Sequence, residues 1–73
     1  MKVVRVSAHS LGRHLGCDVR QMEHNAFCSK MGISPREYTY KDSDDCYYFL
    51  TDHPEWYTCY GGDIVPGMSS LPS

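Results

Sequence analysis

Histidine and cysteine side chains at short spacing are the residues of this chain best suited to chemistry. His14 and Cys17 are separated by two residues and His24 and Cys28 by three, with six residues between the pairs. Zinc takes four nitrogen or sulfur ligands, and a short pair supplies two of them from one turn. These four residues are the candidate metal ligands of a zinc-stabilised interaction module, one alternative function. The competing interpretation is that the thiols are free and packed as small apolar groups.

The even number of cysteines also permits disulfides. Four cysteines allow three pairings, and a hairpin would bring Cys46 near Cys59. The first six residues contain no long apolar run and are interrupted by Arg5, so neither a secretory signal nor a membrane span is expected. We therefore expect a cytoplasmic protein whose thiols are reduced and which needs no cofactor.

Catalysis is not expected from this chain. A Cys–His or His–Asp pair needs a scaffold that fixes its geometry to about half an ångström and keeps water out. Seventy-three residues make at most one small domain, whose core is marginal. No nucleophile signature is present, so we expect neither enzymatic activity nor a small-molecule substrate.

A second alternative is recognition of nucleic acid. Residues 25–38 offer the turn of a helix-turn-helix, with Gly32 in the turn and Ser34 able to cap a second helix. The piece Gly-Ile-Ser-Pro-Arg-Glu-Tyr at 32–38 is similar to the short helix start of AraC-type regulators, which implies a DNA-binding transcription factor. Two features oppose it: residues 39 and 40 favour strands, and three aspartates at 42–45 would repel phosphates.

The elements that must position these residues begin with a strand and one main helix. Residues 3–8 are rich in β-branched side chains and predict a strand, whereas two glycines in 9–17 favour a loop or a single frayed turn. A cap at Asp18, an apolar stripe and a stop at Gly32 predict a helix over about 18–31. Residues 34–41 combine a capping box with strand-like alternation, so both helix and strand remain open there.

The second half of the chain predicts an aromatic hairpin. Residues 46–50 form the best strand pattern, and residues 56–60 read as the returning strand, ended by two glycines. From residue 63 on, Pro, Gly and Ser indicate a flexible tail. The predicted fold is therefore a single small α+β domain over 1–62 with a C-terminal tail at 63–73.

Charge is distributed unevenly, which favours protein binding. Residues 1–37 carry a net charge of +3 and residues 38–73 a net charge of −5. Two ordinary solvated faces would give the same pattern, but such a split also orients docking. Tyr, Trp and Arg dominate many protein interfaces. The predicted partner-binding residues are Tyr48, Trp56 and Tyr57, with Arg5, Arg13 and Arg20 for acidic surfaces of the partner.

In overall style the chain resembles small phage-encoded proteins that take over host machines. Its size, its thiols without a secretion signal and its tyrosine-rich acidic strands are in keeping with that group. Within the group, its length is similar to that of a small RNA polymerase-binding regulator of a Xanthomonas phage. The resemblance implies docking on polymerase subunits in the bacterial cytoplasm, inhibition of initiation and antitermination. It also implies basic and apolar contact residues near the first strand, which Lys2, Val4, Arg5 and Val6 supply.

Overall fold

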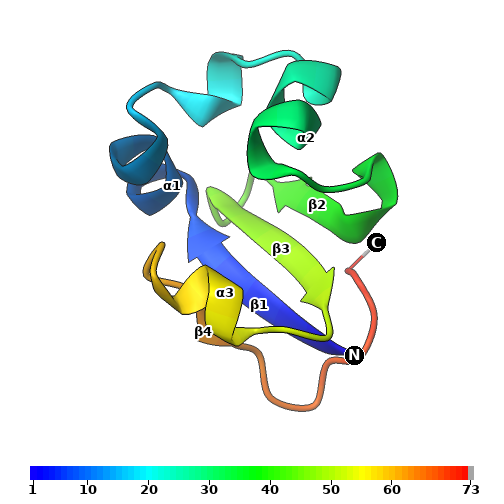
Figure 1. The fold of residues 1–73 in the computed structure, drawn as a ribbon. Helices are drawn as coiled ribbons and strands as arrows, with labels where there is room; N and C mark the ends of the chain where they lie inside the picture. Colours follow the sequence, from blue (N-terminus) through cyan, green and yellow to red (C-terminus); the bar gives the residue numbers. More distant parts are fainter. Residues whose placement is uncertain (73) are drawn as a thin grey trace.

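An antiparallel sheet of four strands forms the centre of the computed structural model, which describes residues 1–72 (Figure 1). The strands lie in the order β2-β3-β1-β4, so the N-terminal strand is central. Their bounds are β1 (Lys2–Ser7), β2 (Tyr38–Lys41), β3 (Cys46–Thr51) and β4 (Asp63–Ile64). The predicted α+β class and the N-terminal strand are confirmed.

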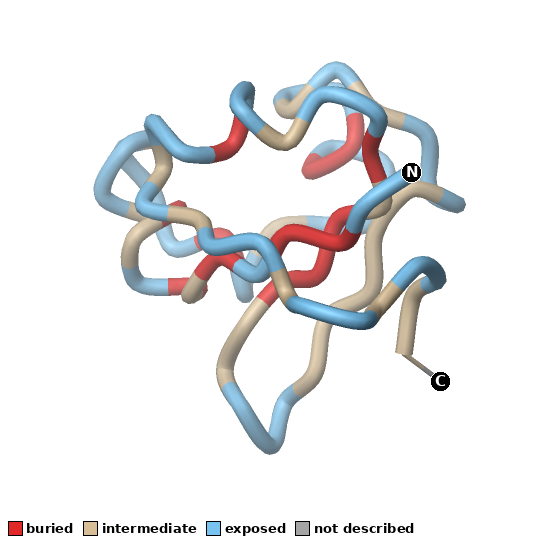
Figure 2. The backbone as a smooth tube through the Cα atoms, turned by 90° about the horizontal axis from the view of Figure 1, so that it is seen from below, coloured by how far each residue is buried: buried red, intermediate tan, exposed pale blue. Residues whose placement is uncertain are grey.

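One face of the sheet carries the core. Val4 pairs with Phe49 across β1 and β3, and Val6 pairs with Tyr47. Because side chains alternate along a strand, these four project to the same face. Helix residues pack against this face, and Figure 2 shows how the buried positions gather where sheet and helices meet. The buried cluster consists of Val4, Val6, Ala8, Leu11, Val19, Phe27, Tyr47, Phe49 and Tyr57.

Most of residues 9–17, predicted as a loop or frayed turn, belong to helix α1 (Ala8–Leu15), so that prediction was wrong. The Ser7 hydroxyl caps the helix by accepting from the backbone amide three residues later, at 3.1 Å. Gly12, which suggested a loop, lies inside the helix. A Cβ at this position would meet the carbonyl oxygen of Cys17 at 2.7 Å, so the glycine lets the following chain fold back over the helix.

The helix predicted over 18–31 is divided in two, which corrects the prediction. A short 3-10 helix, η1 (Val19–Gln21), precedes helix α2 (His24–Met31), and the backbone of Met22 between them is extended. The buried Tyr47 hydroxyl donates to the carbonyl oxygen of Val19 at 3.2 Å. This tertiary hydrogen bond holds η1 against the sheet. A single continuous helix over residues 18–31 would not keep Val19 in this position.

Two sequence signals for helix ends are confirmed around this division. The Asp18 side chain accepts from the backbone amide of Arg20, which caps η1. Gly32 ends α2 with φ of 71°, the left-handed conformation that glycine adopts without strain.

The ambiguity over 34–41 is resolved as a strand after one turn. The capping box between Ser34 and Glu37 is present, but it starts only a 3-10 turn, η2 (Pro35–Glu37). Tyr38–Lys41 then forms β2 along β3. The second helix of a helix-turn-helix does not exist here, because these residues complete the edge of the sheet.

The predicted returning strand at 56–60 is wrong, since helix α3 (Glu55–Thr58) and a turn occupy these positions. Both edges of β3 are already paired, with β1 on one side and β2 on the other. A further strand would therefore find no partner on β3. Pro54, whose fixed φ suits the start of a helix, precedes α3 instead. The hairpin of the second half is formed by β2 and β3.

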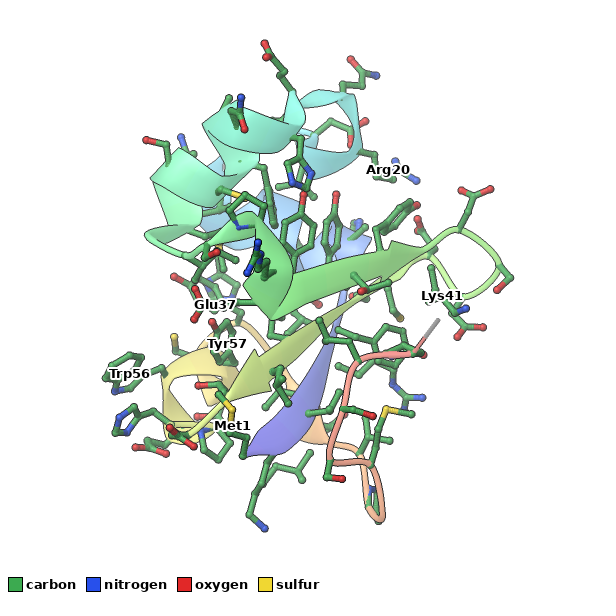
Figure 3. The ribbon with its side chains drawn as sticks, turned by 90° about the vertical axis from the view of Figure 1, so that its right-hand side faces the viewer. Met1, Arg20, Glu37, Lys41, Trp56 and Tyr57 are labelled. Carbon is green, nitrogen blue, oxygen red and sulfur yellow. The ribbon has the colours of Figure 1, made fainter. Side chains whose placement is uncertain are left out.

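The segment expected as a flexible tail begins as part of the sheet. Asp63 and Ile64 form β4 beside β1, and the amide of Val65 donates to the carbonyl of Val3 at 2.9 Å. The following described residues run along the face of the sheet opposite α3 (Figure 3). Val3 points to that face and is fully buried, which is consistent with a covering role for this segment.

Substitution of Gly62 by alanine is expected to lower the free energy of unfolding by about 1–3 kcal/mol, the range for overpacked sites. A Cβ there would lie 2.8 Å from the Tyr57 carbonyl oxygen, 2.8 Å from Val4 and 2.9 Å from Val6. Urea denaturation followed by circular dichroism measures the change. The exposed Ser70→Ala variant is the control, with a change within about 0.5 kcal/mol. An unchanged midpoint for Gly62→Ala would contradict the close packing of this turn.

Candidate functional site

The two histidines proposed as metal ligands make separate aromatic contacts. The His14 ring lies edge-on to Tyr60, with ring centroids 5.6 Å apart. The His24 ring stacks on Tyr38 with centroids 5.2 Å apart, and its Nδ1 is hydrogen bonded to the Tyr38 hydroxyl at 2.6 Å. Each histidine therefore packs on a different tyrosine.

The cysteines are also dispersed. Cys17 is exposed, with its Sγ 3.7 Å from the sulfur of Met22, whereas Cys28 is buried in α2. Among residues 1–72 all four thiols are free, and no group of three or more His, Cys, Asp or Glu side chains is placed to hold a metal ion. Neither the zinc arrangement nor the Cys46–Cys59 disulfide is formed in this structure.

Four of the predicted partner-binding residues lie largely in the interior. Val4 and Val6 are fully buried in the sheet, and Tyr48 and Tyr57 retain only 6% of their surface. Their side chains are unavailable to a partner while the domain is folded. Tyr48 and Tyr57 were predicted from their residue type, and Val4 and Val6 from the resemblance to phage-encoded proteins; in the structure all four belong to the buried apolar set.

The predicted basic residues Lys2, Arg5, Arg13 and Arg20 are all exposed. Arg20 is held by two acidic side chains, with its Nε 3.2 Å from Asp18 and its Nη1 3.4 Å from Asp45. The hydrogen bond from Arg20 also keeps the pKa of the Asp18 carboxyl below its usual value. By contrast, none of the ion pairs among residues 1–72 includes Arg13.

Trp56 is the predicted anchor that the fold exposes. Its exposed fraction is 63%, and its ring stacks on His53 with centroids 4.3 Å apart. Figure 3 shows Trp56 pointing away from the body of the molecule, whereas its neighbour Tyr57 points inward. Consecutive residues of helix α3 face different directions, and here Trp56 faces outward while Tyr57 is buried.

A hollow of about 220 Å³ lies beside Trp56. Met31 and Ile33 border it from the end of α2, and Tyr60 borders it from the turn after α3. Glu37 lines the hollow as an acidic group. The exposed indole and these half-buried side chains together form a surface suited to one side chain of a partner.

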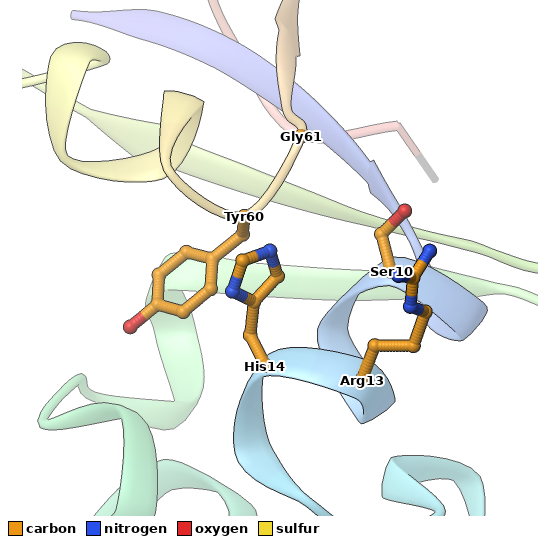
Figure 4. Close-up of a pocket in the computed structure, with 5 residues that line it drawn as sticks. All are labelled: Ser10, Arg13, His14, Tyr60 and Gly61. Carbon is orange, nitrogen blue, oxygen red and sulfur yellow. The ribbon is translucent and has the colours of Figure 1, made fainter.

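A second hollow, of about 230 Å³, also has Tyr60 in its lining (Figure 4). It is lined by Ser10, Arg13 and His14 from α1, together with Tyr60 and Gly61. Figure 4 shows the rings of His14 and Tyr60 next to one another, with Ser10 and Arg13 on the side of Gly61. Tyr60 lines both hollows. We call the residues Arg13, His14, Met31, Ile33, Trp56 and Tyr60, which line one or both of them, the Tyr60 groove.

Sequence reasoning missed Met31, Ile33 and Tyr60 as surface residues. The groove joins segments about thirty residues apart, so no local pattern indicates it. One local signal was present: Trp56 and Tyr60 are four residues apart and follow a proline, a spacing typical of one helix face.

The acidic turn between β2 and β3 is tied down by tyrosine hydroxyls. Tyr40 donates to Asp45 at 2.8 Å, and Tyr48 donates to Asp44 at 2.7 Å. The hydrogen bond to Asp45 raises the pKa of Tyr40 to about 12, and burial raises the pKa of Tyr38 to about 12. The aspartates of this turn are therefore partly engaged within the domain.

The raised pKa values of Tyr38 and Tyr40 predict that the folded state loses stability at alkaline pH. A tyrosine whose pKa is raised from 10.0 to about 12 binds its proton more tightly in the folded state than in the unfolded state. Stability is thus fully present below pH 10 and falls as the pH rises toward 12. Absorbance at 295 nm and circular dichroism, followed together, should show Tyr38 and Tyr40 ionising as the fold is lost. Ionisation of all six tyrosines near pH 10 without unfolding would contradict these contacts.

Comparisons with protein-family models, with curated proteins and with solved structures found no match to this chain.

Even the longest helices among residues 1–72 fall short of the length and apolar character that a membrane crossing requires.

Proposed function

We propose that this chain is a non-enzymatic protein-binding regulator of a larger host machine, bacterial RNA polymerase. On docking it inhibits initiation of transcription and promotes antitermination. The observation that carries the protein-binding part is the exposed Trp56 beside an open hollow. An exposed tryptophan is suited to anchor an interface, because tryptophan is enriched among the residues that dominate binding.

The energetics of such a contact support a single dominant anchor. Tryptophan is enriched among hot-spot residues, whose truncation costs about 2 kcal/mol or more. Trp56 is already stacked on His53, so part of its rotamer freedom is lost before binding. A ring that is already ordered loses less conformational entropy when a partner covers it.

Charge supports docking in one orientation. Arg13 and His14 lie on α1, which contains no acidic residue, whereas the turn between β2 and β3 carries three aspartates. A protein with opposite charges on separate surfaces is steered toward a partner with the complementary arrangement. Lys2 and Arg5, both exposed on β1, are further contacts in the proposed complex.

The choice of RNA polymerase comes from the resemblance to phage-encoded host-takeover proteins, and it places the protein in the cytoplasm of a host bacterium. The two other functional hypotheses gain no support from the fold. The turn η2 and then β2 occupy the positions of a DNA-reading helix, and the four candidate zinc ligands do not form a metal-binding group. Direct binding of nucleic acid is therefore not part of the proposal.

Transcription by purified bacterial RNA polymerase tests the proposal. Adding the chain is expected to reduce runs from a promoter and to increase readthrough of an intrinsic terminator when added after initiation. A mobility-shift assay with the same promoter DNA and no polymerase is the control, and no shift is expected. Unchanged transcription in both assays would refute polymerase as the target. A salt-sensitive shift of the DNA alone would favour the nucleic-acid alternative instead.

A further inference from the structure

We infer that the hollow beside Trp56 binds an arginine side chain of the partner, whose guanidinium contacts the aromatic lining and pairs with the carboxylate of Glu37. This inference rests on the proposed protein-binding function and names the chemical group that enters the hollow.

The lining of this hollow combines aromatic side chains with one negative charge. Trp56, Tyr57 and Tyr60 contribute the aromatic side chains, and Glu37 contributes the carboxylate. Figure 3 shows Glu37, Trp56 and Tyr57 on the same side of the molecule. Within residues 1–72, no lysine, arginine or histidine belongs to the lining. Because aromatic faces and carboxylates both attract cations, the hollow offers a cation two separate attractions.

The charge of Glu37 is left uncompensated by the domain itself. None of the ion pairs among residues 1–72 includes Glu37. Its Oε2 accepts from the backbone amide of Ser34 in the capping box of η2. A carboxylate has about four acceptor positions, so it can accept from a guanidinium and keep this cap. A cationic side chain of a partner would supply the missing countercharge.

The effect of Glu37 reaches the buried part of the lining. Burial raises the pKa of the Tyr57 hydroxyl, and the negative charge of Glu37 raises it further. A charge that disfavours the tyrosinate anion favours a cation placed near the same hydroxyl. Tyr57 is only 6% exposed, so solvent ions screen this effect less than they would at an open surface.

Trp56 is held in place without being covered. His53 stacks on its indole with the ring planes 17° apart, and the Nδ1 of His53 lies 3.5 Å from Glu55. Most of the Trp56 side chain nevertheless stays accessible, and it still contributes to the lining. Among aromatic side chains, tryptophan attracts a cation most strongly.

The shape and polarity of the hollow favour arginine over other side chains. Its volume of about 220 Å³ is below the roughly 300–1,000 Å³ of pockets that enclose whole small molecules. A guanidinium is flat and weakly hydrated, and it can stack on a ring while it donates in its own plane to a carboxylate. Met31 and Ile33 at the border can contact the apolar stem of the arginine. An apolar side chain would instead desolvate Glu37 without giving it a partner.

Titration with Nα-acetyl-arginine methylamide, followed by nuclear magnetic resonance, tests the inference. The chain contains one tryptophan, so its single indole N–H signal reports on Trp56. A saturable shift of this signal is expected. The citrulline analogue, which has a similar shape but no charge, and the corresponding lysine compound are expected to bind about tenfold more weakly. Absence of a saturable shift, or equal binding of either analogue, would overturn the inference.

The Glu37→Gln variant assigns the countercharge. A glutamine at this position can still close the capping box, so the urea midpoint should stay close to that of the unmodified chain. Binding of the arginine compound should weaken about tenfold. Glu55→Gln is the matched control, because Glu55 adjoins Trp56 in sequence but lies outside the lining, and it should retain binding within threefold. Equal losses in the two variants would contradict the role of Glu37.

The same two variants show whether the arginine comes from the partner. In surface plasmon resonance with immobilised polymerase, Glu37→Gln should weaken binding about tenfold and Glu55→Gln less than threefold. If polymerase binds Glu37→Gln as tightly as the unmodified chain, no arginine of polymerase enters the hollow and this inference is wrong.

The outcomes separate this inference from the proposed function. If the chain alters transcription but the arginine compound does not bind, the chemistry assigned to the hollow is wrong and the proposed function stands. If the compound binds through Glu37 but transcription is unchanged, the chemistry of the hollow stands and the target is a different protein.

Discussion

Replacement of Phe27 by alanine is expected to leave the protein largely unfolded at 25 °C. Phe27 is 2% exposed, and its ring lies 4.8 Å from that of Tyr47 and 4.9 Å from that of Tyr38. Truncation of a buried phenylalanine costs about 3–5 kcal/mol. A core of this size supplies only about 3–5 kcal/mol in total, so the loss consumes the whole margin.

Circular dichroism during urea denaturation measures this effect. The folded baseline seen for the unmodified chain should be missing or displaced to low urea in Phe27→Ala. Lys30→Ala, an exposed change on the same helix, provides the control and should shift the free energy of unfolding by no more than about 0.5 kcal/mol. If Phe27→Ala unfolds cooperatively at the same midpoint as the unmodified chain, the aromatic cluster does not hold α2 to the sheet.

Replacement of Trp56 by alanine is expected to weaken binding to RNA polymerase about 30-fold or more, which corresponds to a hot-spot loss of about 2 kcal/mol. Trp56 is 63% exposed, so its removal should leave the unfolding midpoint nearly unchanged. An equal loss of binding and of stability would instead indicate a structural role. Titration by surface plasmon resonance with immobilised polymerase measures the affinity.

Ile64→Ala is the matched control for this substitution. Ile64 is another large apolar side chain left exposed, at 46%, and it lies on β4 rather than in the Tyr60 groove. Its truncation should change the affinity less than threefold. A comparable loss in both variants would mean that general apolar exposure, and not the groove, governs binding.

The parts of the fold that local patterns predict are those in which local and tertiary preferences agree. β1 and residues 46–50 of β3 combine strand propensity with burial, and Gly32 ends α2 as its position suggested. The errors arise where a distant contact decides. Gly12 indicated a loop, but it lies within helix α1. Glycine is needed there because the carbonyl oxygen of Cys17 leaves no room for a Cβ atom.

The same reasoning explains why the candidate site was only partly predictable. Trp56 and the exposed Arg13 were identified from residue type alone. Tyr48 and Tyr57 were assigned to the surface by the same criterion, although pairing and packing bury them. Residue type does not distinguish an aromatic side chain of the core from one of an interface. The direction of the side chain does, and that direction depends on which face of the element the rest of the fold covers.

Photo-crosslinking tests the central claim, docking on polymerase through Trp56, most directly. Benzoylphenylalanine is placed at position 56 in one sample and at position 64 in another, and each chain is irradiated with purified bacterial RNA polymerase. The account predicts a crosslink from position 56 to a polymerase subunit and little or none from position 64. A crosslink from position 64 alone, or none from either position, would contradict docking through the Tyr60 groove.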